Sequence, residues 1–444
     1  MEGGPFAKGQ GRGNGIFCRV VLRRGCVGVG GRPSVGGVSR QCRQPHWPSV
    51  AEKLAVAFPR ERLHPAVVAF VEKSLKAEGG GTRLLQPSGF QAFGLSPRWA
   101  VAFSGGADSL ALLLLLWAHW PERRGRLLAL HFDHRLRGRA SAGDERFCRS
   151  VCAALGVAYA SGAWSAAGGG GGGDGKKCGQ QRVSEAQARE ARMAFFAGQL
   201  SRRRIRCLFL GHQLDDIAET LFMRVARGSG TAGLAAPRPV HHLDNVGVGS
   251  GGGGGGGAAG RGRVHLRPLL TLSKARIVDS LVAAGATWRE DASNAEGDFF
   301  RNRIRLDVLP RWLEAASGRV PSQARDALAG AALTRAQLEE DADALDEWAG
   351  RVARTDADGR LPLTQLAGVP RVVVRRVLHL WLGSLPVASD LSRQGFDSLL
   401  DKLMAARSTR FSLGDHGFAV VKRGWLAYQT AASARVVHHK VRSH

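Results

Sequence analysis

Three features that place proteins in familiar classes are scarce or absent in this chain. Its longest apolar run, Leu110–Ala118, is far shorter than the ~18 residues that a membrane-spanning helix needs. Its seven cysteines include no C-x-x-C pair, which argues against a disulfide framework and an ordinary zinc site. We therefore expect a soluble protein in a reducing compartment, with no membrane contact.

Acidic residues are also few, with 37 Asp and Glu against 63 Lys and Arg among 444 residues, so the formal net charge is +26. A positive field of this size attracts polyanions, and nucleic acid is the usual partner. A GC-rich genome that encodes Arg and Gly freely would produce the same surplus.

The first 60 residues are predicted to be a disordered segment that resembles an organelle transit peptide. The first fifty contain one acid, seven arginines and many glycines, without an apolar stretch long enough for a secretory signal. This interpretation predicts the mitochondrial matrix or the plastid stroma, whereas a bacterial chain would be cytoplasmic. A disordered or wrongly started N-terminus is the alternative.

Residues 61–315 alternate between apolar strands and helices. Expected strands are Trp99–Phe103, Leu127–Phe132 and Cys207–Leu210, and expected helices include Ser109–Trp117 and Ala140–Leu155. Such alternation predicts a Rossmann-like α/β domain, a parallel sheet with helices on both faces. Glycine tracts near 168–173 and 250–257 are expected to be flexible insertions in it.

Residues 316–444 have a different character. Apolar periodicity predicts helices over Pro321–Val352 and Arg371–Leu382, and alternation across Arg410–Tyr428 predicts short strands. We expect a smaller helical module with a short β tail.

A glycine-containing loop follows the first predicted strand. The segment Val101–Ser109 runs from the strand through Gly105 and Gly106 into a helix, so backbone N–H groups can approach a phosphate closely. Asp108 would repel a phosphate unless a cation intervened, which suggests that Mg²⁺ bridges the two. No G-x-x-x-x-G-K-S/T motif is present, and a glycine turn capped by serine is the structural alternative.

Ionisable residues follow two further strands. At about 100° per residue, Asp215, Asp216 and Glu219 fall within about 60° of His212 on a helical wheel. A histidine beside carboxylates suits general-base or metal-anchoring work, although acids at a helix start also complement the helix dipole. After the second strand, Asp133 and Arg137 are placed to contact a base or ribose.

Several arginines are candidates for phosphate contact, because the planar guanidinium pairs with phosphate oxygens. They are Arg189 and Arg192 on one helical face, Arg224 and Arg227 before a glycine-rich turn, and Arg301, Arg303 and Arg305. Solvated helix faces are the alternative for each cluster alone.

Six blocks, in order over about residues 98–312, resemble the motifs of one family, the tRNA(Ile)-lysidine synthetases within the PP-loop (pyrophosphatase-loop) ATPases. The blocks are Ser104–Ser109, His131–Arg137, Glu185–Arg192, His212–Thr220 with Arg227–Leu234, Arg267–Leu270 with Glu290–Asn294, and Arg301–Arg305. Ala292 stands where the family usually has Pro and Met193 where it has Tyr, and neither departure removes a chemical group.

This resemblance implies a carbon–nitrogen ligase that uses ATP and Mg²⁺. AMP would be transferred from ATP to the C2 oxygen of the first-anticodon-position cytidine in an isoleucine tRNA with a CAU anticodon. Free L-lysine would then displace AMP through its ε-amino group, forming lysidine, with AMP and pyrophosphate as the other products. The resemblance also allows a homodimer.

The resemblance implies a role for each candidate residue. ATP binding falls to Ser104, Gly105, Gly106, Ala107, Asp108 and Ser109, with Asp108 also at Mg²⁺. The catalytic candidates are Asp108, Asp133, His212, Asp216, Arg301, Arg303 and Arg305, with His212 and Asp216 handling lysine or its proton. The tRNA or lysine contacts are Arg137, Arg189, Arg192, Asp215, Glu219 and Arg227.

Two other functions are weighed. A PP-loop tRNA thiolase needs cysteine as sulfur relay or cluster ligand, whereas Cys148, Cys152 and Cys207 look structural. A catalytically inactive RNA-binding homologue would have lost loop or His/Asp residues, and all are present.

Overall fold

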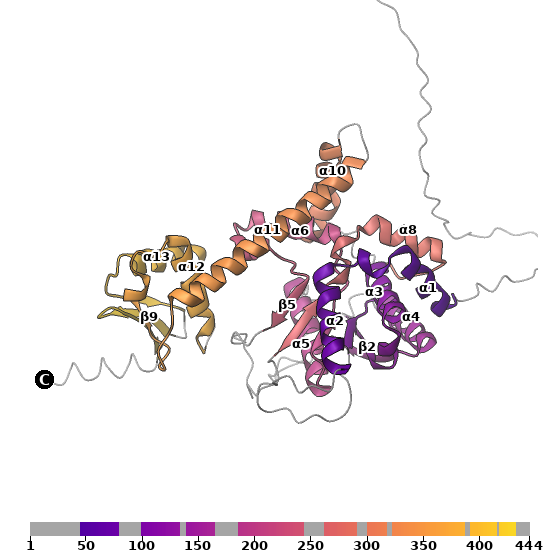
Figure 1. The fold of residues 1–444 in the computed structure, drawn as a ribbon, viewed down its shortest axis with the longest axis horizontal. Helices are drawn as coiled ribbons and strands as arrows, with labels where there is room; N and C mark the ends of the chain where they lie inside the picture. Colours follow the sequence, from indigo (N-terminus) through magenta and orange to yellow (C-terminus); the bar gives the residue numbers. More distant parts are fainter. Residues whose placement is uncertain are drawn as a thin grey trace, which may run out of the picture. The chain divides into compact units, whose positions relative to one another are not determined.

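The computed structural model of the protein (Figure 1) describes residues 45–79, 99–133, 139–164, 185–243, 262–290, 300–317, 322–386, 391–414 and 417–431. Residues 1–44, both glycine tracts and Arg137 lie outside these ranges. No helix in the described ranges is long and apolar enough to cross a membrane.

A six-stranded sheet forms the centre of the first domain. Its strands are β1 (Trp99–Ala102), β2 (Leu127–Asp133), β3 (Ala158–Ala163), β4 (Cys207–Phe209), β5 (Val240–Leu243) and β6 (Arg263–Leu266), in the order β3-β2-β1-β4-β6-β5. Only β5 runs antiparallel to its neighbour. Trp99 of β1 pairs with Leu127 on one side and Cys207 on the other, so the predicted parallel sheet is confirmed.

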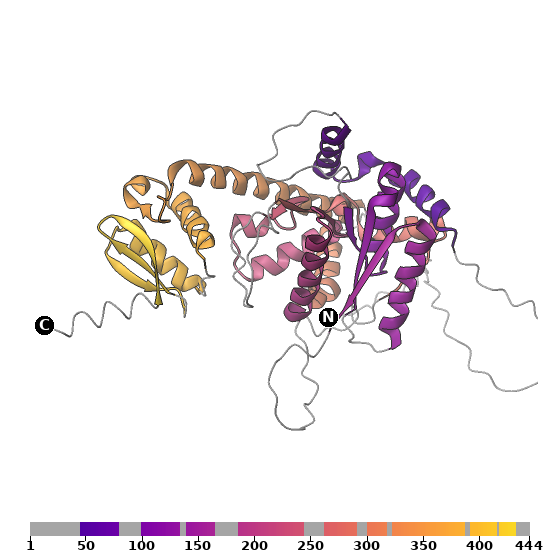
Figure 2. The ribbon, with the colours of Figure 1, turned by 90° about the horizontal axis from the view of Figure 1, so that it is seen from below.

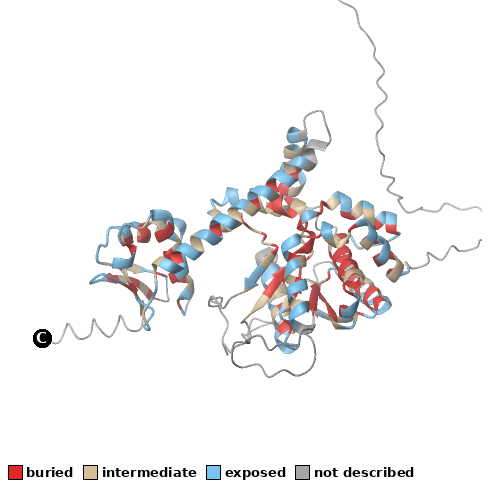
Figure 3. Cartoon of the chain, viewed as in Figure 1, coloured by how far each residue is buried: buried red, intermediate tan, exposed pale blue. Residues whose placement is uncertain are grey.

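Helices cover both faces of this sheet (Figure 2). One face carries α1 (Trp47–Ala57), α3 (Ala107–His119), α4 (Arg139–Leu155) and α8 (Lys274–Ala284), and the other carries α5 (Glu185–Arg202). Ten of the thirteen residues of α3 are buried, and Figure 3 shows the helix red along its length. The glycine-containing loop between β1 and α3 is therefore held at both ends by core elements.

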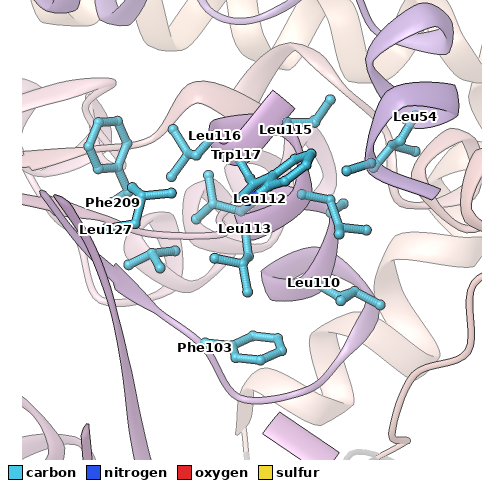
Figure 4. Close-up of a cluster of buried hydrophobic side chains, with 14 of the residues drawn as sticks. Leu54, Phe103, Leu110, Leu112, Leu113, Leu115, Leu116, Trp117, Leu127 and Phe209 are labelled. Atoms are coloured by element: carbon cyan, nitrogen blue, oxygen red, sulfur yellow. The ribbon is translucent and has the colours of Figure 1, made fainter. Parts of the chain in front are cut away.

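The prediction that the first 60 residues are disordered is wrong for Trp47–Ala57, which form the helix α1, and residues 1–44 of that prediction lie outside the described residues. Trp47, Val50 and Leu54 of α1 are buried in the main core, and Figure 4 shows Leu54 directed toward the leucines of α3. Pro48 near the start of the helix has a φ already suited to the first turn. A short 3-10 turn (Arg60–Arg62) and α2 (Pro65–Gly79) follow.

The elements after β4 complete the first domain. They include α6 (Leu214–Ala226), α7 (Thr231–Leu234), a 3-10 turn (Pro268–Thr271), α9 (Phe300–Arg303), a π-helical turn (Ile304–Val308), α10 (Leu309–Ser317) and α11 (Ser322–Val352). Another 3-10 turn, Pro121–Arg126, connects α3 to β2. Leu328 and Ala331 in the first half of α11 pack with Ala218 and Leu309.

The C-terminal module has its own core. It contains β7 (Leu361–Pro362), a 3-10 turn (Leu363–Leu366), α12 (Arg371–Ser384), α13 (Arg393–Met404), β8 (Thr409–Ser412), β9 (Gly417–Lys422) and β10 (Trp425–Thr430). The strands form an antiparallel sheet in the order β7-β10-β9-β8. One of them, β7, precedes α12 and α13 in the chain. Ala349 in the last turns of α11 belongs to this core, so α11 contributes to both domains.

We expect Leu54→Ala in α1 to lower the free energy of unfolding by about 3 kcal/mol, because it removes a fully buried side chain and leaves a cavity. Val56→Ala on the same helix is the matched control, since Val56 is 83% exposed and its loss should cost less than about 0.5 kcal/mol. Urea unfolding of the two variants checks this; equal effects would mean that α1 is not part of the core.

Candidate active site

A cavity of about 1000 Å³ opens beyond the carboxyl ends of the parallel strands. Its wall includes Ser104 and Asp108 after β1, Asp133 at the end of β2, and His212 after β4. Ligands of doubly wound sheets bind at this edge. The first turns of α3, α6 and α8 also reach the cavity, so three helix amino termini with partial positive charge are directed toward it.

The glycine-containing loop is built as a close-fitting turn. Gly105 has φ +89°, and a Cβ there would lie 3.0 Å from the Sγ of Cys148, so glycine is required for both conformation and space. The Ser109 hydroxyl accepts a hydrogen bond from the Ser104 backbone N–H at 3.2 Å and donates one to the Gly106 carbonyl at 3.0 Å. The loop is thereby fixed before any ligand arrives.

Asp108, in the first turn of α3, is paired with Lys274, the first residue of α8. The Lys274 Nζ lies 2.9 and 2.8 Å from the two carboxylate oxygens of Asp108. Burial raises the pKa of Asp108, and the nearby ammonium of Lys274 only partly opposes this effect. The backbone N–H of Lys274 donates to Asp215 at 2.9 Å, so α8 is linked to both α3 and α6.

Helix α6 begins at Leu214. His212, which the helical wheel placed on one face with Asp215, Asp216 and Glu219, therefore lies two residues before the helix. Gln213 is the N-cap residue: its side chain accepts a hydrogen bond from the Asp215 N–H at 2.6 Å, and the Asp216 carboxylate accepts one from the Gln213 N–H at 2.9 Å. This reciprocal capping satisfies N–H groups that the helix itself leaves unpaired. His212 therefore precedes the helix rather than sharing its face.

Two arginines from the segment after Phe300 bind the carboxylates of α6. The Arg301 guanidinium lies 2.5 Å from Asp216 and 3.0 Å from Glu219, and Arg305 donates two hydrogen bonds to Glu219 at 2.6 and 2.9 Å. Burial alone would lower the pKa of both arginines, but the carboxylates outweigh it and raise both values. Arg303 is exposed and lies near the ring of Phe300 instead.

His212 is a neutral side chain with a defined tautomer. Burial, with the charge of Arg267 as the next cause, places its pKa well below the usual 6.5. The Arg267 Nε–H donates to the Nδ1 of His212 at 3.2 Å, and because arginine has no acceptor, the ring proton must reside on Nε2. In this arrangement His212 offers a hydrogen-bond donor, and its basic nitrogen is already engaged.

The remaining predicted residues divide into two groups. Those that line the cavity are Ser104, Gly106, Ala107, Asp108, Ser109, Asp133, Arg189, Arg192, Asp215 and Glu219, together with His212 and Arg305. Arg227 is exposed, does not line the cavity and lies near Phe300. The structure thus brings most of the predicted set together, with Arg227 and Arg303 directed elsewhere.

Three cations of the cavity wall were not predicted. They are Lys274, Arg267 and Arg289. Arg289 donates through its backbone N–H to the Gly105 carbonyl at 3.0 Å and through Nε to Asp144 at 2.7 Å, so it supports the glycine-containing loop. Arg267 is buried, which lowers its pKa to about 10 and leaves it charged at neutral pH. The Arg267-Pro-Leu-Leu block was the available sequence signal for Arg267.

The described cysteines are structural. Cys148 and Cys152 are buried in the core beside α3, and Cys207 lies in β4. Burial raises the pKa of Cys148 strongly and that of Cys152 to about 12, so both thiols stay protonated at neutral pH. None of the three lines the cavity.

The donor set suits a magnesium ion carried by a nucleotide. No group of three or more His, Cys, Asp or Glu in the described residues could hold a metal ion alone. Mg²⁺ commonly takes only one or two protein carboxylates and completes its shell with water and substrate phosphates. Asp108, at the helix amino terminus beside the glycine-containing loop, could supply such a carboxylate.

Comparisons with known proteins place these features in context. The PP-loop domain model matches residues 85–312, and the TilS substrate binding domain model matches residues 361–427. A tRNA(Ile)-lysidine synthase from Solibacter usitatus is 34% identical over 300 residues, which is 66% of this chain and 59% of that protein. One from Pseudomonas syringae is 34% identical, covering 70% and 63% of the two chains.

The chain thus spans about 60% of the length of the curated relatives it matches. Among solved structures, the U34-tRNA thiolase NcsA from Methanococcus maripaludis aligns with 14% identity and a TM-score of 0.39, covering 62% of this chain and 80% of that one. A likeness this low does not distinguish between functions.

Glu219→Gln should destabilise the fold by about 3 kcal/mol, because it removes the more deeply buried of the two carboxylates that Arg301 and Arg305 share, whose side chain is only 1% exposed. Glu347→Gln removes a carboxylate that is 65% exposed and paired with Arg351 on α11, and should cost less than about 0.5 kcal/mol. Chemical unfolding measures both. Comparable losses in the two variants would contradict the special role of the buried cluster.

Stability should fall in acid partly because of His265, whose pKa burial lowers to about 4. Between pH 6.5 and 4, His265 is protonated in the unfolded state but neutral in the folded state. Its contribution to stability is therefore complete only above pH 6.5. Below that, the contribution falls by about 1.4 kcal/mol per pH unit.

Unfolding free energies between pH 5 and 7 should therefore depend less steeply on pH in His265→Gln. The control is His242→Gln, which changes an exposed histidine of neighbouring β5. If the pH dependence of the unfolding free energy is unchanged in the His265 variant, this histidine takes up its proton equally in the folded and unfolded protein.

Proposed function

Since the chain belongs to the PP-loop domain family, we propose that it uses ATP to ligate lysine to a tRNA. In the first half-reaction, the C2 oxygen of the first-anticodon-position cytidine attacks the α-phosphorus of ATP, and pyrophosphate leaves. In the second, the ε-amino nitrogen of L-lysine attacks C2, the C–O bond to AMP breaks and a proton is released. The substrate is tRNA(Ile), which the names of the lysidine synthase relatives contain. Its CAU anticodon is what the motif resemblance implies.

The observation that carries this proposal is the convergence of a glycine-containing loop, three helix amino termini and the Asp108–Lys274 pair on one cavity. Helix amino termini bind phosphate groups through free N–H groups and the helix dipole. A volume of about 1000 Å³ accommodates a nucleotide together with a second substrate group.

We assign the nucleotide contacts to the glycine-containing loop and the cations around it. Bound Mg²⁺ would neutralise charge on the leaving pyrophosphate, and Asp108 would hold it. Lys274 is already within reach of Asp108, so its ammonium can move to a phosphate oxygen when a metal takes its place. Arg305 and Arg267, also on the cavity wall, supply planar phosphate donors.

We assign His212 as a hydrogen-bond donor, not as the base first predicted. Its Nε2–H can contact a substrate oxygen, whereas Nδ1 accepts from Arg267. Asp216 positions α6 through the Gln213 N–H and Arg301, so it acts on structure. The carboxylates of Asp133, Asp215 and Glu290 line the cavity and offer contacts to the ammonium groups of lysine.

The thiolase alternative is not supported by the thiols in the described residues. Cys148 and Cys152 are buried, protonated at neutral pH and outside the cavity wall. An inactive RNA-binding homologue is disfavoured because the loop and Asp108 are intact and assembled.

Two features of the chain beyond the cavity fit a tRNA partner. The net charge of +26 favours a polyanion, and the match to the TilS substrate binding domain falls on the C-terminal module. A homodimer and organelle targeting by the N-terminal segment, predicted over residues 1–60, remain predictions.

The experiment is transfer of labelled lysine into unmodified tRNA(Ile) with ATP and Mg²⁺, using protein without residues 1–44 so that α1 is retained. We expect lysine incorporation together with tRNA-dependent formation of AMP and pyrophosphate. Asp108→Asn and Lys274→Met should each lower both signals by about 100-fold or more, because each removes a group at the developing phosphate charge.

Lys53→Met serves as the matched control, since Lys53 is exposed on α1, and it should retain full activity. AMP formation without lysine incorporation would support the adenylation step but show that lysine is not the nucleophile. Absence of both steps in folded protein would overturn the enzyme assignment.

A further inference from the structure

Five arginines gather at the opposite edge of the sheet from the cavity, where β4 and β6 begin. We name them the amino-edge cluster: Arg202, Arg203, Arg204, Arg206 and Arg263. Helix α5 ends at Arg202, only a short turn precedes β4, and Arg263 is the first residue of β6. Adjacent parallel strands begin at the same edge, so the topology itself brings the five together.

Local hydrogen bonds connect these segments. The Val264 backbone N–H donates to the Arg206 carbonyl at 2.8 Å, and the Arg206 Nε donates to the Gly262 carbonyl at 3.1 Å. Arg263 also contacts the Ser201 hydroxyl. Each of these acceptors is neutral, so the bonds orient the guanidinium groups without compensating their charge.

The cluster has no acidic partner among the described residues. None of the five arginines forms an ion pair with an acid in the described part of the chain, and residues 201–206 contain no acid. Arg202, Arg203, Arg204 and Arg206 are exposed. Some other surface arginines of the same domain are paired, as Arg149 is with Glu145 and Arg238 with Asp343. Uncompensated like charges repel one another, and a bound anion would relieve that repulsion.

The composition of the cluster favours RNA over a lipid surface. Peripheral membrane contacts usually pair cations with apolar side chains that enter the bilayer. Here Leu200 and Ile205 are buried, and none of the exposed large apolar side chains in the described residues belongs to this edge. All five cations are arginine, whose planar group donates two hydrogen bonds to a phosphate.

We propose that the amino-edge cluster binds the phosphodiester backbone of the tRNA substrate away from the anticodon. This inference rests on the proposed function, which makes a tRNA the substrate. The cavity lies beyond the carboxyl ends of the strands and the cluster at their amino ends, so the two sites face opposite edges of the sheet. The contact therefore belongs to a more distant part of the tRNA.

The test compares two RNAs and two triple variants. One variant is R202Q/R203Q/R204Q, which leaves the locally bonded Arg206 and Arg263 in place. The control, K53Q/R62Q/K73Q, removes three exposed charges from the α1–α2 region. Fluorescence anisotropy measures binding of the full-length tRNA(Ile) transcript and of its isolated anticodon stem-loop over a series of salt concentrations.

We expect the cluster variant to weaken binding of the full-length tRNA about tenfold, with a salt dependence shallower by roughly 2 to 3 in log–log slope. Binding of the stem-loop should be unchanged, and the control variant should bind both RNAs like the wild type. Circular dichroism confirms that both variants are folded.

Four results would overturn the inference. An unchanged affinity of the cluster variant for full-length tRNA, or an equal loss for the stem-loop, refutes the distal contact while leaving the proposed function intact. Failure of the wild-type protein to bind either RNA refutes the proposed function and this contact together. Cluster-dependent binding to phosphatidylserine-containing vesicles, with no effect on tRNA, assigns the surface to a membrane instead.

Discussion

The ion cluster between α6 and the segment after Phe300 is the interaction on which the site depends. Two arginines, Arg301 and Arg305, share the carboxylates of Asp216 and Glu219, and Glu219 is almost completely buried. A buried ion pair contributes little net stability, but removing one partner leaves an uncompensated charge. Its value here is geometric, because it fixes α6 and the segment from Phe300 to Val308 along one wall of the cavity.

The cavity wall combines the positive ends of helices with negatively charged carboxylates. The amino termini of α3, α6 and α8 converge there, and each carries partial positive charge. Asp108 in α3 and Asp215 in α6 lie in those first turns, and both contact Lys274 at the start of α8. The negative charges of the two carboxylates are therefore compensated by Lys274 and by the helix amino termini. A nucleotide bound with its metal ion would replace these contacts by others that also compensate the charge.

The strands and central helices could be predicted from the sequence because their apolar patterns are strong. Helix α1 was missed because it follows a long glycine- and arginine-rich stretch, and its burial depends on contact with α3. The sequence suggested that His212 shares a helical face with the carboxylates of α6, whereas Gln213 caps α6 and places His212 just before the helix, although His212, Asp215 and Glu219 still line one cavity. Lys274 escaped prediction since its partner Asp108 is 166 residues away along the chain.

The thiol beneath the glycine-containing loop has a consequence for oxidative stress. Only a thiolate reacts readily with peroxide, and the raised pKa of Cys148 keeps its sulfur protonated within the core. This sulfur lies next to the glycine-containing loop, since a Cβ added at Gly105 would come within 3.0 Å of it. The glycine-containing loop is thus shielded from redox damage for as long as α4 remains packed over it.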